Sequence, residues 1–294
     1  MMPRNRSMPA GGPEWRSAAA RTQQSLPSPA FLSTTMPDGT PWMTCYRRDS
    51  GYLVRFEALA DFEISRDGMT ITSYASPGVS AQTIEHLYQN QAMPLAMSLQ
   101  KKLVLHGSAI EMDGRAIAFL AESGRGKSTL AASFSSNGYR FLTDDGLFID
   151  RKKNQYFVRP GHPSIRLWDD SRTALVPVST RPEPPVDYNA KSRFLASDQF
   201  LFGNIECQLG FVFFLGDGSS RDVSITSISG QEVVIETIRH CFLLGVDEHE
   251  MLKDNFNQLA DLSRLPIFFK LDYPRRYDIL DRVRDAVVKH IDLG

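Results

Sequence analysis

The sequence predicts a mixed α/β protein whose N-terminal part is rich in β-strands. Three observations support this fold class. Residues 31–71 form short apolar runs separated by turn-forming dipeptides such as Asp-Gly and Ser-Gly. A glycine-bearing turn at residues 121–129 follows an apolar run and precedes a helical pattern. Between residues 232 and 291, apolar side chains repeat at helical spacing in three stretches.

Composition limits the classes of partner that the chain can have. Its 294 residues are enough for one large domain or for a main domain with a smaller companion. A hydrophobic content of 42% and a charged content of 23% are typical of a globular protein. The net charge of -1 and the pI of about 6.6 create no field that would attract nucleic acid, so no nucleic-acid partner is expected.

Cysteine usage and apolar run lengths predict the compartment. The three cysteines, Cys45, Cys207 and Cys241, are far apart, which argues against a disulfide framework or a zinc site and favours the cytoplasm. Apolar runs such as Phe211–Leu215 are too short to cross a bilayer. No membrane partner is therefore expected.

The chain divides into three predicted parts. Residues 1–30 carry five prolines and four arginines against one glutamate, which predicts a disordered basic leader. Residues 31–100 are expected to form the small β-rich N-terminal domain, which ends in a helix over 79–99 that Pro94 would kink. Residues 101–294 are expected to form the main domain.

The main domain is expected to alternate strands and helices. Its predicted strands cover residues 102–110, 116–120, 208–215, 223–228 and 267–271. Helices are expected after residue 129, over 232–244 and 248–262, and as a closing helix over 277–291. Trp168 is expected to lie in the core rather than in a site.

The turn after the strand Ala116–Leu120 matches the phosphate-loop (Walker A) pattern. Glycines let backbone N–H groups turn toward a polyphosphate, and the N-terminus of the following helix adds partial positive charge. Lys127 would reach the β- and γ-phosphates, and Ser128 would bind Mg²⁺. Ala121 stands where the pattern has glycine, and it fits the turn only with a negative φ. The predicted nucleotide-binding residues are Glu122, Ser123, Gly124, Arg125, Gly126, Lys127, Ser128 and Thr129.

A pair of carboxylates narrows the predicted chemistry. Asp144 and Asp145 follow an apolar strand, where phosphate-loop proteins place the acid that holds Mg²⁺. One of them could order the metal while the other accepts a proton from an attacking hydroxyl. Which aspartate has which role remains open at this point. The alternative to a functional pair is a solvated Asp-Asp-Gly turn at the end of a strand. His106, with Gly107 and Ser108, belongs to the end of the predicted strand that precedes the phosphate-loop strand, and it could point to the same edge of the sheet.

Four basic residues are candidates for holding phosphate or a peptide carboxylate. Guanidinium groups offer two parallel donors to such anions. Arg166 is the strongest of them, and each could instead be a solvated surface residue. The four are Arg166, Lys191, Arg193 and Arg275.

Three segments in this order resemble the catalytic domain of HPr kinase/phosphorylase. They are His106-Gly107, Glu122–Ser128 and Gly138–Asp145, and the resemblance covers about residues 101 to 150. It implies a phosphate-loop fold shared with PEP carboxykinase, ATP and Mg²⁺ as cofactors, and transfer of phosphate to a serine. Relatives of this domain assemble into oligomers, so a homo-oligomer is implied too. The glycine-rich segment that follows the acid pair in that family is not visible here, so the resemblance does not extend to the reverse, phosphorylase reaction.

A second resemblance is to the HPr-kinase-like enzymes encoded with lasso peptides. It is carried by the segments Tyr52–Phe56, Ala60–Phe62, Leu105–Ala109, Pro160–Trp168 and Asp272–Arg275. Those enzymes phosphorylate the C-terminal serine of the lasso precursor peptide, a ribosomally made substrate.

Together the motifs and the resemblances predict a serine kinase acting on a peptide. His106 matches the family's active-site histidine, and Asp144 and Asp145 match its acid pair. One aspartate would deprotonate the serine, while His106 and Lys127 stabilise charge on the transferring phosphate and Arg166 clamps the substrate. The alternatives are an HPr-type protein kinase/phosphorylase and a nucleotide-binding regulator without catalysis.

Overall fold

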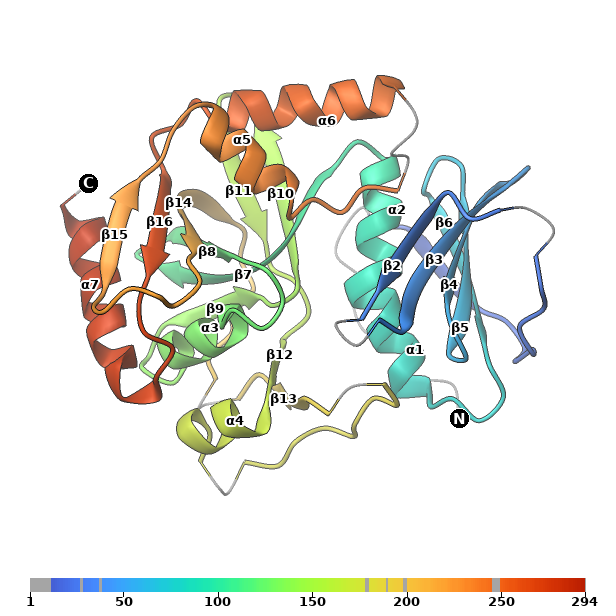
Figure 1. The fold of residues 1–294 in the computed structure, drawn as a ribbon, viewed down its shortest axis with the longest axis horizontal. Coiled ribbons are helices and arrows are strands. Elements are labelled where there is room, and N and C mark those ends of the chain that lie inside the picture. The colour runs from blue at the N-terminus through green and yellow to red at the C-terminus, as the bar shows by residue number, and fades with distance from the viewer. Residues whose placement is uncertain are drawn as a thin grey trace. The chain divides into compact units, whose positions relative to one another are not determined.

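The computed structural model describes residues 12–26, 29–36, 39–177, 180–188, 190–197, 200–244 and 249–293. Within these ranges the chain folds into two compact units, each with its own sheet (Figure 1). The first unit comprises residues 1–102, 185–189 and 243–252, and the second comprises the rest. No helix in the described part of the chain is long and apolar enough to span a membrane.

The first unit contains a six-stranded sheet in the order β1-β6-β5-β4-β3-β2. Strands β2 to β6 form an antiparallel meander, which agrees with the turn signals at the corresponding positions. The helical run that follows contains a π-helical turn, so the predicted single helix is divided before Pro94. The strands are β1 (Glu14–Ser17), β2 (Leu32–Thr35), β3 (Pro41–Arg48), β4 (Gly51–Phe56), β5 (Ala60–Ser65) and β6 (Thr70–Ala75), and the helical segments are α1 (Ala81–Leu87), η1 (Tyr88–Ala92) and α2 (Met93–Leu99).

The predicted disordered leader is corrected for residues 12–26. Strand β1 pairs in parallel with β6, and the Trp15 ring stacks on Tyr88 with centroids 4.2 Å apart. Gln23 donates its Nε2 to the Phe56 carbonyl at 3.0 Å. Hydrogen bonds to an existing sheet edge order this segment in spite of its polar composition. The remainder of the predicted leader, residues 1–11 and 27–28, lies outside the described residues.

The second unit is built on an eight-stranded mixed sheet that curls on itself. Its main order is β11-β10-β7-β8-β14-β16-β15, β9 pairs with β7, and β11 also pairs with β14. Strands β8, β14 and β16 run parallel, whereas β7 is antiparallel to β8. The strands are β7 (Leu103–Met112), β8 (Arg115–Leu120), β9 (Arg140–Thr143), β10 (Gly146–Lys152), β11 (Gln155–Arg159), β14 (Cys207–Leu215), β15 (Ser224–Ser227) and β16 (Phe268–Asp272).

Helices and a small two-stranded sheet complete the second unit. Strands β12 and β13, which come after β11 in the chain, form a separate antiparallel two-stranded sheet. The predicted helix over 232–244 ends early, and the predicted closing helix begins with one 3₁₀ turn. These elements are α3 (Lys127–Ser135), β12 (Ser164–Leu167), α4 (Asp169–Leu175), β13 (Ser192–Leu195), α5 (Gln231–Ile238), α6 (His249–Leu262), η2 (Tyr277–Ile279) and α7 (Leu280–Asp292); the boundary between the two units falls within α6.

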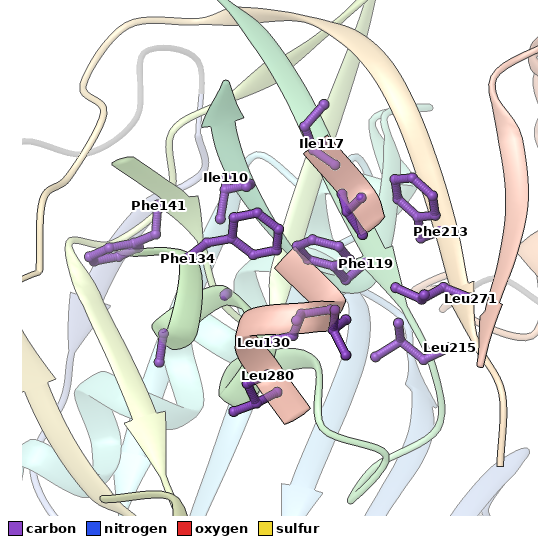
Figure 2. Packing of buried hydrophobic residues seen from close by; sticks show 14 of the residues in the cluster. Ile110, Ile117, Phe119, Leu130, Phe134, Phe141, Phe213, Leu215, Leu271 and Leu280 are labelled. Carbon is purple, nitrogen blue, oxygen red and sulfur yellow. The ribbon is translucent and has the colours of Figure 1, made fainter. Parts of the chain in front are cut away.

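Strand β8 is buried on both faces, which explains its continuous apolar sequence. Ile117 and Phe119 enter a core that includes Leu130 of α3 and Leu280 of α7 (Figure 2). The alternate residues of β8 enter a second core, which contains residues of α5 and α6. A central strand covered on both sides reads as apolar throughout rather than alternating. The C-terminal end of β8 is thereby held rigidly where the phosphate-loop turn begins.

Candidate active site

The turn between β8 and α3 has the geometry that phosphate binding requires. Gly124 has φ +82° and Gly126 has φ +93°, values that residues with a side chain rarely adopt. Ala121 is buried and lies outside the left-handed region, so it meets the condition under which alanine can replace the first glycine. The backbone thus turns directly into the N-terminus of α3, where N–H groups are available to an anion.

Lys127 is held inside this turn. Its side chain is only 6% exposed, and Nζ donates to the Ala121 carbonyl at 2.7 Å and to the Glu122 carbonyl at 3.1 Å. Loss of hydration on burial lowers the pKa of the ammonium to about 8, against the opposing effect of Asp145 and Asp144. A lysine in such a position is weakly hydrated and available to a phosphate.

Two predicted loop residues contribute differently from the others. The side chains of Glu122 and Arg125 lie 3.5 Å apart as an ion pair, and Arg125 Nη1 donates to the Asp217 carbonyl at 3.2 Å. Both side chains are absent from the lining of the cavity that the loop borders, whereas Ser123 and Thr129 belong to it. Any contribution of Glu122 and Arg125 to anion binding therefore comes from their backbone.

Asp144 is anchored by three hydrogen bonds. Its Oδ1 accepts from Ser108 Oγ at 2.6 Å and from Ser128 Oγ at 2.8 Å, and its Oδ2 accepts from the Arg166 backbone N–H at 3.2 Å. Burial raises the pKa of this carboxyl, and the neighbouring charge of Asp145 raises it further. The structure thus joins the phosphate-loop serine to the first aspartate, 16 residues away in sequence.

Asp145 has a different environment from its neighbour. It adopts φ +73°, a left-handed conformation, and its side chain lines the cavity. Its carbonyl accepts from Gly107 N at 3.2 Å and lies 3.1 Å from His106 Nδ1. The backbone turn between the two aspartates therefore sends one carboxylate to Ser128 and the other to the cavity.

His106 reaches the site by a different route from the predicted one. It does not end its strand: β7 continues to Met112, and because β7 is antiparallel to β8, residue 106 lies beside the carboxyl end of β8. Burial and the charge of Lys127 lower the pKa of His106 to about 4. The ring is therefore neutral, with Nδ1–H donating to the Asp145 carbonyl and Nε2 left as an acceptor. This state does not agree with the expected role of His106 in stabilising negative charge.

A second histidine accompanies His106, and the sequence did not predict it. Helix α5 is followed by a turn at residues 239–240 and then by a β-bridge between Leu105 and Cys241. Through this bridge, the His106 backbone N–H donates to the His240 carbonyl at 2.6 Å. Burial also lowers the pKa of His240 to about 4. The sequence offered little indication of this contact, because the apolar pattern of residues 232–244 predicted one continuous helix, whereas α5 ends at Ile238.

Three of the four predicted basic candidates line the cavity, namely Arg166, Lys191 and Arg275. Arg275 is fixed by hydrogen bonds from Nη2 to the Gly216 carbonyl at 2.6 Å and from Nη1 to the Tyr273 carbonyl at 2.9 Å. Arg193 lies opposite Arg166 in the register of the paired strands β12 and β13, but it does not line the cavity. The lining of the cavity therefore combines these three basic residues with two acidic ones, Asp145 and Asp170.

The cavity itself has a volume of about 240 Å³. Two of its residues are exposed aromatic side chains, Trp168 and Tyr277, at 47% and 38% exposure. The expectation that Trp168 lies in the core is wrong, because the chain turns from β12 into α4 at this residue and leaves the ring outside. The lining residues are His106, Ser123, Gly124, Gly126, Lys127, Ser128, Thr129, Asp145, Arg166, Leu167, Trp168, Asp170, Ser171, Lys191, Tyr273, Arg275, Arg276, Tyr277 and Leu280.

Of the predicted metal ligands, Ser128 and Asp144 are already adjacent. A hydroxyl and a carboxylate are ligands that Mg²⁺ prefers, and one or two protein groups with substrate phosphates usually suffice for it. No cluster of three or more histidine, cysteine or acidic residues with metal-binding geometry occurs among the described residues. The oxygen donors present fit Mg²⁺ held jointly with a phosphate, rather than a metal held by protein alone.

Comparison with known proteins gives limited sequence similarity. No family model matches the chain. An HPr kinase/phosphorylase of Mycoplasmopsis pulmonis is 21% identical over 161 residues, covering 52% of this chain and 52% of that protein. The chain thus spans about half the length of the curated relative that it matches. The HPr(Ser) kinase/phosphatase structure from Coxiella burnetii covers 54% of this chain and 96% of its own at 12% identity, with a TM-score of 0.28 that is too low to equate the folds. The chain is therefore similar to HPr kinase/phosphorylase over about half of its length.

Proposed function

We propose that this chain is an ATP-dependent kinase that transfers the γ-phosphate of ATP to a serine hydroxyl. The observation that carries the proposal is the separation of the two aspartates. Asp144 is bonded to Ser128 of the phosphate loop at 2.8 Å, while Asp145 lines the cavity beside Lys127. Similarity to an HPr kinase/phosphorylase over half the chain supports the same class of reaction.

The proposed roles follow from these positions. The N–H groups of the loop and Lys127 bind the β- and γ-phosphates. Ser128 and Asp144 would hold Mg²⁺, which when bound offsets the charge of these phosphates. Asp145 accepts the proton of the serine hydroxyl, and the serine oxygen then bonds to the γ-phosphorus. The bond from the γ-phosphorus to the bridging oxygen breaks, and ADP leaves.

His106 and Arg166 have supporting parts in this proposal. His106 is neutral and donates to the Asp145 carbonyl, so it holds the main chain of the base in its left-handed conformation. Arg166 lines the cavity with its side chain and fixes Asp144 with its backbone N–H. Its guanidinium would bind the transferring phosphate or an anionic group of the acceptor.

We infer further that the acceptor is a peptide serine, specifically the C-terminal serine of a lasso precursor. A terminal serine has a carboxylate close to its hydroxyl, and the cavity that Asp145 lines is also lined by Arg166, Lys191 and Arg275. Three segments of the lasso-associated resemblance contribute cavity residues, including His106, Trp168 and Arg275. The cytoplasm as compartment and a homo-oligomeric state remain predictions.

The test is phosphate transfer to a short synthetic precursor ending in serine, followed by mass spectrometry. We expect a single phosphate on the terminal serine, and none on matched peptides that end in alanine or in serine amide. Asp145→Asn should lower kcat by about 10²–10⁴ while ADP affinity changes little, because the base acts only in the transfer step. Phosphate on a folded carrier protein but not on the peptide would favour an HPr-type kinase. Nucleotide binding without transfer to either acceptor would contradict the kinase proposal and favour a regulator.

A further inference from the structure

Two exposed aromatic rings border the cavity, and the proposed reaction has no role for them. Among the described residues, eight large apolar side chains are exposed, and three of these are aromatic. Two of the three, Trp168 and Tyr277, line this single cavity, while the third, Phe256 on α6, does not. Exposed aromatic rings gathered at one cavity are a feature of sites that stack a planar ligand.

A chain of hydroxyl groups joins Tyr277 and helix α4, which begins after Trp168, to helix α3 at the phosphate loop. Thr129 Oγ1 lies 2.9 Å from Ser171 Oγ, and Ser171 Oγ lies 3.1 Å from the Tyr277 hydroxyl. Ser171 is in the first turn of α4, directly after the Trp168 backbone that begins this helix. The Trp168 carbonyl also accepts from the Arg172 N–H at 2.8 Å. Both rings are therefore positioned relative to α3, although they come from segments more than 100 residues apart.

The two hydroxyl residues after Lys127 form hydrogen bonds to two different segments of the chain. Ser128 bonds to Asp144, which marks the metal and γ-phosphate end. Thr129 bonds instead to Ser171. Since the phosphates of a nucleotide run in a line from the γ-phosphate to the nucleoside, the nucleoside leaves the loop on the side of Ser171 and the two rings.

We propose that Trp168 and Tyr277 bind the purine base of the nucleotide by stacking, an inference that rests on the proposed nucleotide-dependent function. The Lys191 ammonium lies 5.4 Å from the centre of the Trp168 ring, which supports that ring from another side. No ring contact joins Trp168 to Tyr277 in the part of the chain that the structure describes, so neither ring covers the other. Stacking selects for ring area, so adenine and guanine should bind similarly and pyrimidines more weakly.

Binding of ADP and of pyrophosphate separates the base from the phosphates. Calorimetry should show that Trp168→Ala raises the Kd for ADP about tenfold to a hundredfold, the range expected for one lost base stack. Tyr277→Ala should act in the same direction, and Tyr277→Phe should keep most of the affinity because the ring remains. The Kd for pyrophosphate should stay within about twofold in all three, which also shows that the variants are folded. Phe256→Ala is the matched control, as an exposed ring away from the cavity.

Tryptophan fluorescence provides a second measurement. The chain has three tryptophans, and Trp15 and Trp42 belong to the first unit. In a Trp15→Phe, Trp42→Phe background, the emission of Trp168 should be quenched by ADP and not by pyrophosphate. The double variant must first bind ADP as the wild type does.

Several outcomes would overturn the inference. Unchanged ADP affinity in Trp168→Ala and Tyr277→Ala would leave the kinase proposal intact and exclude base stacking. A higher KM for the acceptor with unchanged ADP affinity would place the rings on the acceptor instead. Equal losses for ADP and pyrophosphate would mean a structural role. If the wild type binds neither ligand, and Lys127→Ala therefore changes nothing, the proposed function and this inference both fail.

Discussion

Lys127 should make nucleotide binding depend on pH in a way that its surroundings determine. Burial in the phosphate loop lowers the pKa of this ammonium from 10.5 to about 8. Only the charged form attracts phosphate, so the affinity should fall as the pH rises through this value. An ammonium with a pKa of about 8 is about nine-tenths charged at pH 7 and about one-tenth charged at pH 9, so the Kd for ADP should rise about tenfold between them.

Calorimetric titration with ADP without metal measures this change directly. The phosphates of ADP remain ionised between pH 7 and pH 9, since the second pKa of a phosphate group is about 6. Lys127→Arg is the matched control: a guanidinium stays charged throughout, so its affinity should be flat between pH 7 and 9 even if it is weaker. A wild-type Kd that does not change over this interval would refute the reasoning. So would the same tenfold rise in Lys127→Arg, because the titrating group would then lie elsewhere.

Three further predictions concern the surroundings of the site and the first unit. Because the pKa of His106 is about 4, kcat/KM should show no inflection from this residue near neutral pH; an inflection near pH 6.5 that is lost in His106→Gln would contradict its neutral state. Gly161→Ala should lower the free energy of unfolding by about 1–3 kcal/mol, since its Cβ would lie 2.3 Å from Thr143 Oγ1, and the loss should shrink in a Thr143→Ala background. Asp61→Asn should lower the free energy of unfolding measured in urea by about 3–5 kcal/mol, because it leaves the buried guanidinium of Arg55 without its ion pair. Glu14→Gln, which removes the exposed ion pair with Arg16, should have no measurable effect.

Several features of the fold followed from local sequence patterns. The strand Ala116–Leu120 and the turn after it were predictable because a doubly covered strand is continuously apolar and a left-handed turn requires glycine. The antiparallel meander of the first unit was similarly predictable from its turns. These patterns depend on interactions between residues close in sequence, so the sequence alone contains them.

Contacts between distant segments were not predictable in the same way. Residues 12–26 are mostly small or polar and carry no apolar strand pattern, yet strand β6 supplies hydrogen bonds that order them. Trp168 has a large aromatic side chain of the kind that usually lies in a core, but its position at the start of α4 leaves it exposed. The strand that orders residues 12–26 lies more than 50 residues away, and the exposure of Trp168 depends on where the chain turns into α4. Neither is visible in the periodicity of the sequence.

The sequence by itself determined which residues are candidates for the proposed phosphate transfer: the loop lysine, the loop serine and the acid pair. Only the tertiary structure decided how these residues differ in role. Asp144 and Asp145 are chemically identical neighbours, and the left-handed turn at residue 145 directs one to Ser128 and the other to the cavity. The charge of His106 and Lys127 was likewise decided by burial, because the pKa of a side chain depends on its hydration and its neighbours in space.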